Sequence, residues 1–284
     1  MFRRSVWSCF CALVLASTCK AQATVPVSSG MTRGAGDAKV PVSGELPELA
    51  TDRPDFTEVT ETVRPGVVQV EMGFTLDREG GVRHLSQGEI LSRIGLTPRL
   101  ELRLGGEGLL SERGSGSAWH RGVSDTEVGF KLSLWEQKKM RPALSLIPML
   151  SMPSGSRAFT SSTFDPTLKM VLSEDLPVGF TLGGNLNFSS ISGDTHRITQ
   201  EAWSLSLGHD LTRGFGAYWE AFSIGPWEPG SSPAYLINSG VTHGLGRNAQ
   251  IDFRGGQRLT DVGPNWFFGV GFAFRQPTHL LPHW

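Results

Sequence analysis

The chain has little cysteine, and none of it where a folded domain would use it. Its three cysteines, Cys9, Cys11 and Cys19, all lie near the start of the sequence. The remainder has no thiol for a disulfide, a thiolate metal site or a nucleophilic cysteine. These three kinds of chemistry are therefore excluded for the rest of the chain.

Long apolar runs and an excess of one charge are also missing. No segment approaches the roughly 20 uninterrupted apolar residues that a transmembrane helix needs, which excludes a helical membrane protein. The formal net charge is −1 over 284 residues, so the basic excess typical of nucleic-acid-binding proteins is absent. We expect no nucleic-acid partner.

The first 23 residues have the layout of a signal peptide. Arg3 and Arg4 precede an apolar run from Val6 to Ser17, and Ala21-Gln22-Ala23 supplies a small-x-small cleavage site. A lipoprotein attached through Cys19 is the alternative, but the residues before it lack the expected Leu and the expected small residue. We predict export, with a signal peptide over residues 1–23.

Residues 24–50 are rich in Pro, Gly, Ser, Val and Thr and show no sustained period. Such composition predicts a flexible segment ahead of the folded part. No second folded domain is indicated, so residues 51–284 form one predicted domain.

The folded part is dominated by stretches of about ten residues in which apolar and polar residues alternate. In residues 67–76, Val68, Val70, Met72, Phe74 and Leu76 point one way and the polar residues point the other. Alternation repeated many times predicts an all-β fold, a transmembrane antiparallel up-and-down β-barrel of about 12 strands. The predicted strands are residues 67–76, 88–97, 100–110, 125–135, 143–153, 164–174, 178–189, 198–208, 214–224, 234–243, 249–259 and 265–275.

Loop lengths support the same fold. Short turns such as 97–99 and 175–177 alternate with longer connections such as 77–87 and 111–124. Outer-membrane barrels have short periplasmic turns and long outer loops. We therefore predict the cell outer membrane as the location, after export to the periplasm.

Charged residues fall in mid-strand on the polar face, whereas the opposite face is almost free of charge. A soluble secreted β-barrel is the alternative, and it would bury the apolar faces against each other as a core. The charge placement favours a membrane barrel with a charged lumen. The candidate lumen-lining residues are Glu71, Arg93, Glu101, Arg103, Glu107, Glu127, Lys131, Lys169, Glu220, Asp252, Arg254 and Arg258.

Asp52-Arg53-Pro54-Asp55 stands out ahead of the first strand. Pro54 restricts the backbone of Arg53, and two carboxylates beside a guanidinium can form a compact, hydrogen-bonded turn. Such a segment either folds into the periplasmic mouth and pairs with lumen charges, or caps the first strand without touching any solute. Neither role is catalytic.

Two segments carry a family resemblance. Residues 51–58, Thr-Asp-Arg-Pro-Asp-Phe-Thr-Glu, followed by Gly-Val-Val-Gln-Val-Glu at 66–71, resemble the opening of a family of outer-membrane transporters named for the phenol meta-cleavage degradation pathway. Residues 265–275 resemble the last strand of that family. The resemblance implies a passive channel for small solutes, often aromatic, that contacts outer-membrane lipid and is inserted by the barrel-assembly machinery.

Enzyme and cofactor signals are weak. A lipid-modifying barrel enzyme would need a nucleophile, a His and an acid converging on the outer surface. His84, His120 and His196 lie in different predicted outer loops, and no Gly-x-Ser-x-Gly, His-Glu-x-x-His or phosphate-binding glycine loop occurs. We expect no enzyme activity and no cofactor or metal, with a closed structural barrel or a lipid-modifying enzyme as alternatives to the channel.

Overall fold

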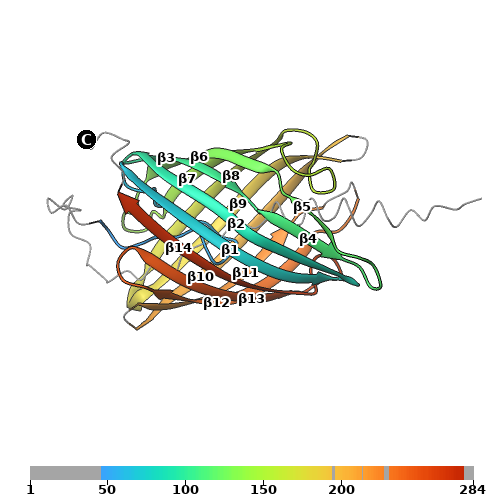
Figure 1. Cartoon of the computed structure of the whole chain (residues 1–284). Coiled ribbons are helices and arrows are strands. Elements are labelled where there is room, and N and C mark those ends of the chain that lie inside the picture. Colours follow the sequence, from blue (N-terminus) through green and yellow to red (C-terminus); the bar gives the residue numbers. More distant parts are fainter. Residues whose placement is uncertain (1–45, 194–195, 213, 227–229, 278–284) are drawn as a thin grey trace, which may run out of the picture.

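The computed structural model describes residues 46–193, 196–212, 214–226 and 230–277. The signal peptide predicted over residues 1–23 lies outside the described residues, as does most of the flexible segment predicted over 24–50. The described chain folds as one antiparallel β-barrel, and the segment before the first strand enters the barrel at one end (Figure 1).

The described residues form fourteen strands and a short 3-10 helix, η2 (Pro177–Gly179). Among them, no helix is long and apolar enough to span a membrane. In chain order the strands are β1 (Val67–Glu79), β2 (Val82–Thr97), β3 (Leu100–Gly106), β4 (Leu109–Arg113), β5 (His120–Val123), β6 (Thr126–Trp135), β7 (Ala143–Met152), β8 (Asp165–Leu176), β9 (Phe180–Ser192), β10 (Arg197–Thr212), β11 (Phe215–Ile224), β12 (Ala234–Gly244), β13 (Ala249–Arg258) and β14 (Trp266–Pro277).

The barrel closes because β1 pairs with both β2 and β14. The circuit runs from β2 through β3 to β6 and onward to β14 without β4 and β5. Twelve of the described strands therefore form the wall, and the predicted fold class is confirmed. Val67, at the start of β1, lies opposite Pro277, at the end of β14. The chain therefore enters β1 at the same end of the barrel as the end of β14, the left end in Figure 1.

The opposite end carries more strand than the sequence predicted. Only Gly80 and Gly81 separate β1 from β2, where a loop over 77–87 was expected. The strand expected over 100–110 is broken at Gly108, where φ is +73°, and continues as the hairpin β4–β5, which pairs with the outer part of β2. A glycine in the left-handed region interrupts the ladder without ending the sheet. Alternation alone therefore predicted too few strand residues at this end of the barrel.

Apolar side chains face outward along the strands and polar ones face inward. On β6, Phe130 and Leu132 are 42% and 40% exposed, whereas Lys131 between them is 0% exposed. Among the described residues, buried polar and charged side chains outnumber buried apolar ones. This is the reverse of a soluble barrel and is the arrangement that lipid requires.

Candidate functional site

Residues 46–66, called the inner segment below, lie inside the barrel. Their hydrogen bonds reach β1, β2, β7, β9, β11 and β13, which are spread around the whole wall. Only a segment in the lumen can contact all of these strands. Its buried side chains are Leu49, Thr51, Asp52, Arg53, Pro54, Asp55, Phe56, Thr57, Glu58, Val59, Thr60 and Val63.

Asp52 is the centre of the charge network. Arg103 Nη1 lies 2.6 Å from its Oδ2, Lys131 Nζ lies 3.0 Å from Oδ1, and Arg93 Nη1 lies 3.4 Å from Oδ2. Burial by itself raises the pKa of Asp52, but the three cations outweigh that effect and hold the pKa well below its usual range. The carboxylate is therefore ionised and fixed between β2, β3 and β6.

Two glutamates of the wall hold the backbone of the inner segment. The N–H groups of Asp52 and Arg53 donate to Glu71, at 2.9 and 3.0 Å. Across the barrel, the N–H groups of Phe56 and Thr57 donate to Glu220, at 2.9 and 2.7 Å. Hydrogen bonds from backbone N–H groups to a carboxylate are short and strong. The segment is thus anchored at two points on opposite walls.

Arg53 lies against two glycines of the wall. Gly73 on β1 and Gly271 on β14 face each other directly and point inward. A Cβ atom at either position would overlap the side chain of Arg53. Nη1 of Arg53 donates to Glu89 at 2.6 Å. Both glycines are therefore needed for this side chain to reach its partner.

Arginines and carboxylates alternate along the wall next to Asp52. Arg93 donates to Glu101 through Nε at 2.9 Å and through Nη2 at 3.1 Å, a two-point contact. The same arginine reaches Glu71 at 3.1 Å, and Arg103 reaches Glu101 at 2.9 Å. Each buried charge in this part of the lumen has an opposite charge beside it, as buried ions require.

Three further candidates also contact the inner segment. Lys169 on β8 binds Glu58 at 2.7 Å. Arg254 on β13 donates to the carbonyl oxygen of Pro54 at 3.0 Å, and Asp252 lies 3.6 Å from Arg53. Together with Glu71, Arg93, Glu101, Arg103, Lys131 and Glu220, nine of the twelve candidate residues thus surround the segment.

The other three candidates lie apart from this network. Glu107 is in the link between β3 and β4, where its N–H donates to Ser124. Glu127 is half-buried on β6, toward the outer end of the barrel. Arg258, at the end of β13, donates to the carbonyl oxygens of Asp261 and Gly263 and braces the outer loop. All three lie toward the end of the barrel away from the entry of the inner segment.

Sequence reasoning missed Glu89, which contacts Arg53 and lies 3.8 Å from Arg254. Glu89 shares the strand parity of Arg93, so strict alternation from Arg93 would have found it. The uncharged inward residues were also missed, because only charged residues in mid-strand were predicted to line the lumen. They include Asn185, Asn187, Ser204, Ser206, Tyr218 and Asn238.

The lumen also holds an aromatic cluster at β11 and β14. Phe56 of the inner segment stacks on Phe222, with ring centroids 4.8 Å apart. Phe267 meets Phe222 edge-on at 6.4 Å, and Leu236 is buried in the same cluster. An apolar aromatic surface is therefore available inside the polar lumen once Phe56 is removed.

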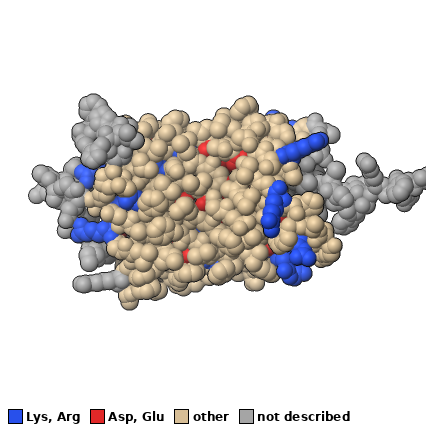
Figure 2. Space-filling view, in the orientation of Figure 1, with Lys and Arg blue, Asp and Glu red and all other residues tan. Residues whose placement is uncertain are grey.

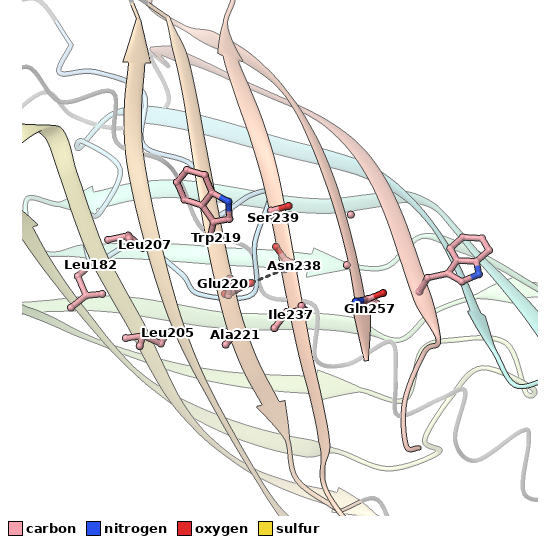
Figure 3. Close-up of a pocket in the computed structure, with 13 residues that line it drawn as sticks. Leu182, Leu205, Leu207, Trp219, Glu220, Ala221, Ile237, Asn238, Ser239 and Gln257 are labelled. Carbon is pink, nitrogen blue, oxygen red and sulfur yellow. Dashed lines mark hydrogen bonds between the residues drawn. The ribbon is translucent and has the colours of Figure 1, made fainter. Parts of the chain in front are cut away.

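A separate cavity of about 800 Å³ lies on the outward face of β9–β14 (Figure 3). Leu205 and Trp219 line it and are both 53% exposed, and the small side chain of Ala221 lies between larger neighbours. Glu220 and Asn238, which share a hydrogen bond in Figure 3, are inward neighbours of these residues. The cavity therefore faces lipid and is not part of the lumen.

A family model described as "Putative MetA-pathway of phenol degradation" matches residues 51–276. No curated protein matches the chain by sequence. An outer-membrane channel from Pseudomonas putida F1 is similar in structure, with 14% identity and a TM-score of 0.56 over 76% of this chain and 98% of that chain. The NanC porin has 12% identity and a TM-score of 0.47, covering 73% and 98%. The CymD monoaromatic hydrocarbon channel has 8% identity and a TM-score of 0.42, covering 76% and 90%. The Pseudomonas putida likeness shows the same β-barrel fold, and the apolar outer face of the barrel is the arrangement that a membrane requires.

Proposed function

Because the chain belongs to the family described as "Putative MetA-pathway of phenol degradation", we propose that it is an outer-membrane channel for the passive entry of small solutes, small aromatic compounds among them. The inner segment occupies the lumen of this channel and controls passage. Diffusion needs no cofactor and no catalytic group. Contact with lipid on the outer face and insertion by the barrel-assembly machinery belong to the same proposal.

The aromatic cluster carries the proposal. Phe56 places a ring against Phe222 inside a lumen lined mostly by polar and charged side chains. Stacked aromatic rings attract each other beyond the area they bury. A small aromatic solute can take the place of the Phe56 ring when the inner segment moves, and then lies against Phe222 and Phe267.

Polar groups beside this cluster support a hydrated path. In the described part of the chain, the buried Tyr218 hydroxyl has no hydrogen-bond partner in the protein, and the buried carboxylate of Asp252 has only the 3.6 Å ion pair with Arg53. Buried polar groups are normally satisfied by protein or by water. These groups are on β11 and β13, next to the aromatic cluster, so water and solute would share the same side of the lumen.

A closed structural barrel is the competing interpretation, since the same contacts also seal the lumen. Conductance in planar bilayers and uptake of phenol by proteoliposomes distinguish the two. We expect measurable conductance for the refolded mature protein and a several-fold rise in phenol uptake for Phe56→Ala. Phe253→Ala, which removes an outward ring on β13, is the matched control and should leave uptake unchanged. No conductance and no uptake in all three proteins would establish the closed barrel.

A further inference from the structure

Four arginines cluster on the outward face at the end of the barrel away from the entry of the inner segment. Arg78, Arg83, Arg113 and Arg121 belong to β1, β2, β4 and β5, and all four are exposed. Figure 2 shows Lys and Arg side chains gathered at this end of the molecule, on its right. Their strands are neighbours, so the cluster is continuous in space.

Strand register brings the guanidinium groups side by side. Arg83 lies directly opposite Arg78 on one side and Arg113 on the other. Arg121 lies opposite Ser111, two positions from Arg113 on the same face. Residues directly opposite each other have Cβ atoms about 4.5–5.5 Å apart, and like charges in such positions destabilise a sheet.

The cluster has no carboxylate to balance it. Over the described ranges, none of the four arginines takes part in an ion pair, in contrast to the arginines of the lumen. Glu79 and Glu112 are next to Arg78 and Arg113 in sequence, but alternation turns their side chains to the other face. The known partners of Arg78 and Arg113 are carbonyl oxygens of Gly80 and Ser117, which leave most of the donors available.

The cluster borders the apolar band of the barrel. Leu76, Leu85 and Val123 lie two positions from Arg78, Arg83 and Arg121 on the same outward face, toward the membrane. Trp266 lies directly opposite Arg78, and Arg113 lies over the ring of Trp119 at 5.9 Å. Aromatic residues mark the interface in such barrels. The guanidinium groups are therefore at the level of the lipid head groups at this end of the barrel.

From this geometry we infer a binding site for a phosphorylated lipid of the outer leaflet, with its phosphates on the arginine cluster and its acyl chains on the apolar surface beside it. Guanidinium groups bind phosphate through two parallel hydrogen bonds, which suits several arginines on one face. The adjoining apolar surface favours a lipid over free phosphate. This site is independent of the proposed channel function and stands even if no conductance is found.

The test uses the refolded mature protein in neutral detergent and bis-phosphorylated lipid A as the probe. Native mass spectrometry measures the affinity of the protein for lipid A. The triple variant Arg83→Gln, Arg113→Gln, Arg121→Gln should bind about 10- to 100-fold more weakly, since each basic residue at a lipid surface contributes appreciably to binding. Lipid A without phosphates should show a similar loss with the wild-type protein.

A matched control carries the same change of charge at the other end of the barrel. Arg99→Gln, Lys138→Gln, Lys139→Gln alters exposed residues of the turns there and should keep wild-type affinity. Without lipid A, the triple arginine variant should resist urea as well as the wild type or better, because like charges are removed. The inference is overturned if this variant binds lipid A normally, if it is less stable without lipid, if the control loses affinity equally, or if millimolar inorganic phosphate displaces the lipid.

Discussion

The two walls of the lumen hold the inner segment in different ways. The charged wall, formed by β1–β3 and β6, binds Asp52 through Arg93, Arg103 and Lys131. The polar wall, formed by β9–β12, binds residues 56–58 through Glu220, Asn185 and Ser204. On the charged wall, ion pairs do the binding. On the polar wall, neutral donors and stacked rings do it.

This difference indicates which contact yields first. If Asp52 leaves, three buried cations on the charged wall share only the carboxylates of Glu71 and Glu101. A buried charge that is not fully balanced costs several kcal/mol. Water or a polar solute can replace the hydrogen bonds of the polar wall at a much smaller cost. We expect the inner segment to release the polar wall while it remains attached to the charged one.

Removal of the central carboxylate tests the difference between the two walls most directly. Asp52→Ala leaves three buried cations without their shared partner and should lower the free energy of unfolding by about 3–5 kcal/mol. Thr57→Val, which removes a hydroxyl that bonds Glu220 and Ser204 on the polar wall, should cost about 1 kcal/mol. Urea unfolding in detergent micelles measures both, and similar costs would mean that the walls do not differ.

An added charge should destabilise the fold on the outward side of the charged wall, although charges on its inward side are paired and stable. Phe130→Arg, next to the buried Lys131, should cost about 2–4 kcal/mol near the membrane midplane. Met140→Arg, in a turn where the side chain is 91% exposed, is the control and should be nearly neutral. A tolerated Phe130→Arg in urea unfolding would contradict the assignment of the faces.

The glycine pair beside Arg53 offers a milder way to disturb the charged wall. Gly271→Ala overlaps Arg53 and should cost about 1–3 kcal/mol, with a rise in conductance as the side chain moves. A Cβ at Gly255, on the outward face, meets only ordinary contacts, so Gly255→Ala should change neither quantity. Equal effects of both variants would show that Arg53 has room to adjust.

Ion selectivity should depend more on the polar wall than on the charged one. Glu101 is balanced by Arg93 and Arg103, whereas the hydrogen-bond partners of Glu220 are neutral. Glu220→Gln should therefore raise the selectivity for anions, measured as a shift of the reversal potential, more than Glu101→Gln does. The shift should shrink at 1 M salt, where the Debye length is about 3 Å. A larger shift for Glu101→Gln would reverse the comparison.

The smallest expected effect is that of mild acid on Asp52. Its pKa is held below the ordinary value of 3.8. A lowered pKa stabilises the folded state at any pH above the pKa of the unfolded state. This stabilisation is lost only as the pH falls through the pKa of the folded state. The stability difference between wild type and Asp52→Asn should thus be the same at pH 5 and pH 8. A smaller difference at pH 5 would contradict the ion pairing of Asp52.

The faces of the strands could be read from the sequence because alternation is a local property. Phe130, Lys131 and Leu132 show the correct faces with no knowledge of their neighbours. The β4–β5 hairpin could not be found in this way, since it depends on Gly108 and on pairing with β2. Glycine bulges break the two-residue period of a strand.

For the inner segment, the sequence identified its residues but not its position. Asp52 and Arg53 indicate a compact charged turn in the sequence. Such a turn is consistent both with pairing to lumen charges and with capping of the first strand. The contact between Phe56 and Glu220 joins residues 164 positions apart. No local pattern encodes such a distance.

The sequence by itself predicted export, the β-barrel class and the side of each strand that faces lipid. These properties follow from composition and from a two-residue period. Only the tertiary structure decided that most of the lumen charges pair with the inner segment. Closure of the barrel brings β2, β6 and β11 around one interior, and a buried charge there takes whichever opposite charge or donor the closed wall places within reach.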